Sequence, residues 1–150
     1  MNLLSRRSLL AIAAVVDVAI HARPTPVAAK FLAARHNLPP RHLETILQQL
    51  VKAGILKGVR GPRGGYELAR ERRRISAGEI VRAAMVVTNE EGLPPIPESA
   101  LVDHVICPVV KDAAEAFLAQ LDAVTVEDIC RRADSGNVID IPETAGDFNI

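Results

Sequence analysis

Hydrophobic residues recur every three or four positions over residues 5–21, which predicts an amphipathic helix. This helix should end before the sequence ARPTP, because the residue that precedes a proline resists helical geometry. Residues 26–36 predict a second, short helix, with Pro26 in its first turn. A third helix is predicted over residues 40–53, where one apolar stripe consists of Leu43, Ile46, Leu47, Leu50 and Val51.

Two strand-like pieces follow the third helix, ILKGVR and YELA, and a glycine-rich tip joins them. Helix, helix, short turn, helix and hairpin is the order of elements in a winged helix-turn-helix. Another helix is predicted over residues 76–88, where Ser76 and Glu79 are spaced as a capping box.

The rest of the chain is less regular. Residues 89–107 contain three closely spaced prolines and are predicted to form a loop, whereas helical spacing returns over residues 108–123. Residues 125–132 predict a short capped helix, and residues 135–150 lack periodicity and are expected to be mobile. The predicted fold class is mainly α with a small β-hairpin wing, followed by a C-terminal helix.

Charge divides the chain into two halves, although the net charge of the 150 residues is zero. Residues 1–82 hold 15 Lys and Arg against 5 Asp and Glu, whereas residues 83–150 hold 3 against 13. A basic half of this kind favours a polyanionic partner, which the acidic half should avoid.

The N-terminus resembles a twin-arginine export signal, because an apolar run follows Ser5, Arg6 and Arg7. However, Asp17 interrupts that run after about nine residues, and no A-x-A-like cleavage site follows. The run is also too short to span a bilayer. We therefore expect a cytoplasmic protein whose first helix stays in the mature fold.

The tip, within VRGPRGGYEL, is not a P-loop, because it lacks the residue order G-x-x-x-x-G-K-[ST]. It is not a dinucleotide fingerprint either, because no helix begins at its last glycine. The simplest reading is a hairpin turn in which glycines adopt positive φ. A bare turn does not require Arg60 and Arg63, whereas a small-residue loop with two guanidinium groups can approach nucleic-acid phosphates. Catalytic motifs are missing from the chain, which indicates that it is not an enzyme.

The stretch LETILQQLVKAGILKGVRGPRGGYELAR resembles the signature of the IscR/NsrR/CymR family of bacterial winged-helix regulators. The likeness covers residues 1–88 and continues more loosely through residues 108–123 and VTVEDI. It implies a homodimeric transcription factor that represses from a palindromic double-stranded DNA operator. Residues 1–88 would then be the DNA-binding domain, 89–107 a sensor-type loop, 108–134 the dimerisation and terminal helices, and 135–150 a mobile tail.

Under this resemblance the third helix is the recognition helix, and its candidate contacts to bases and phosphates are Arg41, His42, Glu44, Thr45 and Gln48. Arg60 and Arg63 of the wing belong to the same interface, and Arg6, Arg7 and Lys30 are expected to contact the DNA backbone. Two alternatives remain open, namely a merely solvated polar face and a helix-turn-helix that binds a partner protein.

Cluster-binding members of the family place three cysteines in the loop that corresponds to residues 89–107, where only Cys107 occurs here. We therefore expect no iron–sulfur cluster, although a mixed site of Cys107 with Asp103 or His104 is conceivable without support from any spacing rule. Cys130 lies outside the loop.

Cys107 precedes Pro108, so we expect it to be the N-cap of the dimerisation helix. The helix dipole would then lower its thiol pKa, as in a redox sensor. The alternative is a small buried side chain that fills a gap in the packing. His21 and His36 end helices and are expected to cap carbonyl groups.

Overall fold

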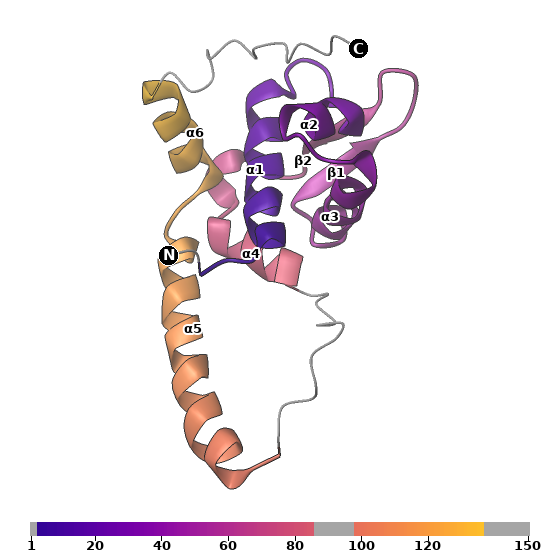
Figure 1. Cartoon of the computed structure of the whole chain (residues 1–150). Coiled ribbons are helices and arrows are strands. Elements are labelled where there is room, and N and C mark those ends of the chain that lie inside the picture. The colour runs from indigo at the N-terminus through magenta and orange to yellow at the C-terminus, as the bar shows by residue number, and fades with distance from the viewer. Residues whose placement is uncertain (1–2, 86–97, 137–150) are drawn as a thin grey trace.

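The computed structural model describes residues 3–85 and 98–136 (Figure 1). In chain order, its elements are α1 (Arg6–His21), α2 (Ala29–Arg35), α3 (Pro40–Lys52), β1 (Leu56–Val59), β2 (Gly65–Leu68), the 3-10 turn η1 (Arg72–Arg74), α4 (Ala77–Met85), the π-helical turn η2 (Val102–Ile106), α5 (Cys107–Asp122) and α6 (Val126–Ser135). The predicted mainly helical fold with one antiparallel hairpin is confirmed. None of the described helices is long and apolar enough to cross a membrane.

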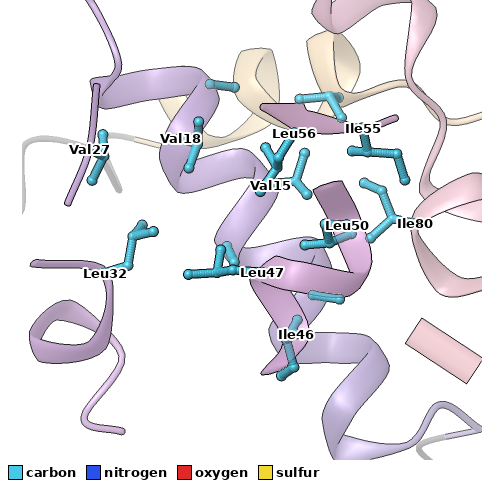
Figure 2. Packing of buried hydrophobic residues seen from close by; sticks show 14 of the residues in the cluster. Val15, Val18, Val27, Leu32, Ile46, Leu47, Leu50, Ile55, Leu56 and Ile80 are labelled. Atoms are coloured by element: carbon cyan, nitrogen blue, oxygen red, sulfur yellow. The ribbon is translucent and has the colours of Figure 1, made fainter. Parts of the chain in front are cut away.

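Helix α1 forms the centre of the molecule, with α2, α3 and the hairpin on one side and α6 on the other (Figure 1). Figure 2 shows Val15 of α1, Leu50 of α3 and Leu56 of β1 converging in the core. Ala11 and Ala14 of α1 are fully buried. Because these small side chains let neighbouring backbones approach, a core of Ala, Val, Leu and Ile packs without large aromatic residues.

Helix α2 is shorter than its pattern predicts, because the residues before it pair with the hairpin. The backbone of Val27 exchanges two hydrogen bonds with Tyr66 of β2, with N–O distances of 3.0 and 2.8 Å. Residues 26–28 are therefore extended rather than helical. Gly65 permits this approach, since a Cβ atom on it would lie 2.3 Å from the carbonyl oxygen of Val27.

The buried side chain of Asp17 links α1 to the C-terminal end of α2 through hydrogen bonds. Its carboxylate accepts hydrogen bonds from Arg35 Nε at 2.8 Å and Nη2 at 2.6 Å, and lies 3.0 Å from His36 Nε2 and His21 Nδ1. Burial would raise the pKa of Asp17, but the bonds from His36 and Arg35 and the positive charges of Arg35 and His21 lower it to about 2. His21 also bonds the Asp17 carbonyl, as expected of a cap, whereas His36 bonds the carboxylate instead.

The helix that carries α5 begins earlier than predicted. Ser99 Oγ accepts a hydrogen bond from the amide of Val102 at 3.2 Å, and helical backbone runs from Ala100 through η2 into α5. The expected loop is therefore wrong for residues 100–107, while residues 89–97 lie outside the described part. Of the expected mobile tail 135–150, Ser135 instead belongs to α6, and residues 137–150 lie outside the described part. Cys107 is not an N-cap, because its own amide bonds the carbonyl of Val102 inside the helical stretch.

The two capping boxes begin α4 and α6 as the sequence predicts. Glu79 N donates to Ser76 Oγ at 3.1 Å, and Asp128 N donates to Thr125 Oγ1 at 3.1 Å. The bridge between Ser76 and Thr125 then brings the two helix starts together. Ion pairs from Arg82 to Asp122 and from Arg72 to Glu127 further join the basic half to the acidic half.

Candidate nucleic-acid interface

Helix α3 divides its residues between the core and solvent as its pattern predicts, except that Val51, expected in the apolar stripe, is 37% exposed. Leu43, Ile46, Leu47 and Leu50 are buried. All five candidate contact residues of the helix are exposed: Arg41, His42, Glu44, Thr45 and Gln48. Because the buried stripe fixes which side faces the core, this polar side is held toward solvent, where a helix can enter a DNA major groove.

The hairpin carries its two arginines at an exposed tip that projects from the body (Figure 1). Strand pairing ends at Val59 and Gly65, so Arg60 and Arg63 lie in the connecting loop. Gly61 adopts a φ of 117°, which side-chain-bearing residues rarely adopt, and the turn therefore depends on it. The tip thus presents two guanidinium groups on a short, small-residue loop.

The recognition-type helix and the hairpin are neighbours. Burial raises the pKa of the Tyr66 phenol above its ordinary value of 10.0, and the negative charge of Glu44 on α3 raises it further. Glu44 is also the one acidic residue among residues 18–66, which contain eight Lys and Arg. The surface made by α3 and the hairpin is basic in composition, and its second carboxylate, Glu67 on β2, is paired with Lys57 at 3.1 Å.

The remaining candidate contacts differ in their surroundings. Arg6 is exposed at the start of α1, and Lys30 is exposed on α2 with its Nζ 5.1 Å from the ring centre of Phe31. Arg7 is half-buried instead, and its Nη2 donates a 2.7 Å hydrogen bond to Gln49 Oε1 on α3. The sequence placed Arg7 with Arg6 as a backbone contact and gave Gln49 no role. The one signal in the sequence was that Gln49 lies at the border between the polar and apolar sides of α3, where a side chain can turn toward the core.

Comparison with known proteins identifies the family. The model of the Rrf2 family, described as iron-dependent transcriptional regulators, matches residues 4–132. The chain belongs to the Rrf2 family. This family comprises bacterial DNA-binding transcriptional regulators rather than enzymes, and it includes the IscR and CymR proteins that the sequence resembles.

Individual Rrf2 relatives match over most of their length. A Synechocystis sp. protein named as an HTH-type transcriptional regulator is 34% identical over 131 residues, covering 84% of this chain and 86% of the relative. The solved structure of T. potens IscR shares 32% identity and 89% coverage of both chains, with a TM-score of 0.69. CymR, the global cysteine regulator of B. subtilis, shares 25% identity, covering 88% of this chain and 98% of that one, with a TM-score of 0.64.

The residues present do not fit an iron–sulfur cluster of the kind expected for cluster-binding Rrf2 proteins. The whole sequence contains two cysteines, whereas that type of site uses three from one loop. Cys107 is exposed on α5 and Cys130 is buried in α6. Across residues 3–85 and 98–136, no three His, Cys, Asp or Glu side chains come together as a metal site.

The surroundings of Cys107 differ from what the sequence indicated. The side chain is exposed, so it does not fill a gap in the core of the described chain. It also lies inside a helical stretch rather than at the helix start where the sequence placed it. Burial raises the pKa of the Cys130 thiol, and the neighbouring Arg72 guanidinium offsets only part of that rise. Cys130 is thus a packed side chain rather than a reactive thiolate.

Proposed function

We propose that this Rrf2-family protein is a sequence-specific transcriptional repressor that binds a palindromic operator as a homodimer in the bacterial cytoplasm and carries no iron–sulfur cluster. The observation that supports this proposal best is the exposed polar side of α3 beside a basic hairpin tip in a chain of this family. A DNA duplex offers both a groove for the helix and phosphates for the tip.

The proposed contacts divide into those that read bases and those that bind phosphates. Arg41, His42 and Gln48 on α3 can donate to base edges, while Glu44 can accept from a cytosine amino group and reject other bases. Thr45 offers a hydroxyl and a methyl group on the same exposed side. The tip arginines Arg60 and Arg63, together with Arg6 and Lys30, supply positive charge for phosphates, which positions the protein without specifying sequence.

The exposed apolar side chains of the α5 region support pairing of two chains. In the single chain this stretch has no buried residue, and five apolar side chains are at least 45% exposed: Leu101, Val105, Ile106, Val109 and Val110. Such a surface is unusual on a monomeric protein. A second copy of the same helix would cover it, and the resulting two-fold symmetry would place two recognition helices about 34 Å apart, one turn of DNA.

Selection of duplexes from a randomised DNA library tests this proposal directly. Immobilised wild-type protein should enrich a palindromic site, and titration followed by fluorescence anisotropy should give tighter binding to that site than to a scrambled duplex of equal composition. Gln48→Ala should reduce this preference, whereas Gln120→Ala on α5, also exposed, should not. If no duplex is enriched at low salt, the helix-turn-helix instead serves another partner such as a protein.

A further inference from the structure

The contact between Arg7 and Gln49 joins the first turn of α1 to the last turn of α3. Arg7 Nη2 lies 2.7 Å from Gln49 Oε1, and the two residues are 42 positions apart in the sequence. Both side chains are half-buried. A hydrogen bond from a charged donor is shorter and stronger than one between neutral groups, and it is also directional.

Most of the packing between α1 and α3 is apolar and lacks such direction. Val15 of α1 contacts the same core cluster as Leu47 and Leu50 of α3 (Figure 2). Burial of these side chains sets which side of α3 faces the core, but because the hydrophobic effect is non-directional it leaves smaller rotations of α3 about its own axis less constrained. The hydrogen bond between Arg7 and Gln49 adds a directional constraint at the C-terminal end of α3.

The surroundings of Arg7 make it a poor phosphate ligand. Arginine binds a phosphate best through the fork formed by Nε and one terminal nitrogen. In Arg7, Gln49 occupies Nη2, and Nε is shut off from solvent with no hydrogen-bond partner among the described residues. Arg6, the preceding residue, is exposed and provides a natural comparison.

We infer that Arg7 is a positioning residue for the recognition helix rather than a contact to the DNA backbone. By holding Gln49 inward, Arg7 sets the rotation of α3 and thereby the direction in which the adjacent Gln48 faces the bases. This assignment rests on the proposed DNA-binding function of α3. It places the Arg7–Gln49 pair among the determinants of sequence preference, although neither residue needs to touch a base.

The test uses full-length Arg7→Met, Gln49→Met, the double variant and Arg6→Met, each titrated with the duplex selected by the wild-type protein and with a scrambled duplex. Gln49→Met is the decisive arm because it removes the acceptor without changing the charge. It should weaken binding to the selected duplex about fivefold to tenfold and leave binding to the scrambled duplex unchanged. The double variant should prefer the selected duplex no less than Arg7→Met alone.

The comparison variant should behave differently. Arg6→Met removes a phosphate-type contact, so it should weaken both duplexes by a similar factor and reduce the slope of log affinity against log salt by about 0.9. Gln49→Met should leave that slope unchanged. Thermal melting of each variant sets a working temperature at which all are folded, so that lost stability is not mistaken for lost preference.

Failure of this inference is distinguishable from failure of the proposed function. If the wild-type protein enriches a duplex but Gln49→Met binds it with unaltered affinity, Arg7 does not act through Gln49. Additive losses in the double variant would lead to the same conclusion. If no duplex is enriched, the DNA-binding proposal itself fails. Should Arg7→Met not fold, the Gln49→Met arm alone still decides, because it leaves α1 unchanged.

Discussion

Helices α3 and α5 present opposite kinds of surface to solvent. In α3 four apolar side chains are buried, Val51 is 37% exposed, and the other exposed side chains are mostly polar or charged. In η2 and α5 no residue is buried, and the exposed apolar side chains include Val105 of η2 and Val109 of α5 at 53% and 65%. An amphipathic helix packed on its own domain leaves a polar side for a polar partner, whereas an uncovered apolar side needs another apolar surface. The two surfaces therefore fit the two partners proposed for them, a nucleic acid and a second copy of the chain.

The strongest test of this contrast introduces charge into the exposed apolar stretch that η2 and α5 form together. Val105→Glu combined with Val109→Glu should convert a dimer into a monomer, because burying unpaired carboxylates costs several kcal/mol, on the order of 3–5. Light scattering after size-exclusion chromatography would measure the mass. Gln120→Glu adds a charge at an exposed polar position of the same helix and should leave the dimer intact. A double variant that stays dimeric would show that α5 is not the pairing surface.

A second test changes the hairpin that lies beside α3 and leaves α5 unaltered. Gly65→Ala would place a Cβ atom 2.3 Å from the Val27 carbonyl, which should push the hairpin away from the segment before α2 and cost about 2–3 kcal/mol of unfolding free energy. Gly58→Ala, on the opposite strand, meets nothing within 4 Å and should change stability by less than about 1 kcal/mol. Chemical denaturation measures both. Equal effects would contradict the close approach of the two segments.

Asp17 predicts a pH dependence of stability. Its folded pKa of about 2 lies below its ordinary value of 3.8, so the carboxylate stabilises the fold fully above pH 3.8, and this stabilisation disappears as the pH falls through about 2. The contribution at neutral pH is on the order of 2 kcal/mol. Denaturation of the wild-type protein and Asp17→Asn between pH 7 and pH 2 should show a difference that shrinks on acidification. If the difference in unfolding free energy between the two proteins stayed constant with pH, ionisation of Asp17 would not be its cause.

The smallest expected effect concerns the wing. Arg60→Gln should weaken binding of the selected duplex and lower the salt slope by about 0.9, because one phosphate contact is lost. Lys111→Gln removes one positive charge from α5 and should not alter the slope. Anisotropy titrations at several salt concentrations compare the two. A slope that Arg60→Gln leaves unchanged would remove this residue from the phosphate-binding set.

The sequence predicted the elements whose determinants are local. The strict spacing of Leu43, Ile46, Leu47 and Leu50 predicted α3, the Ser76–Glu79 capping box predicted the start of α4, and a capped helix was predicted from Thr125, where α6 begins. Local sequence patterns could not predict contacts between residues that are far apart in the sequence. The bridge of Val27 to Tyr66, the Arg35 bond to Asp17 and the Arg7 bond to Gln49 each join residues that only the fold brings together.

The start of the α5 region was misplaced for a specific physical reason. Pro108 usually marks the first turn of a helix, because it has no N–H to donate. Here the preceding π-helical turn bonds Cys107 N to Val102 O, and this wider turn lets the helical backbone continue into the proline. Consequently the sequence located the cap at Cys107, although the first side-chain bond of this helical stretch comes from Ser99.

We propose that α3 and the wing bind DNA while α5 pairs two chains. One titration of the selected duplex, followed by sedimentation across a range of salt concentrations, measures stoichiometry and salt dependence together. We expect two chains per duplex and an affinity that falls steeply with salt, because several phosphates are neutralised. One chain per duplex, or an affinity that does not change with salt, would contradict it.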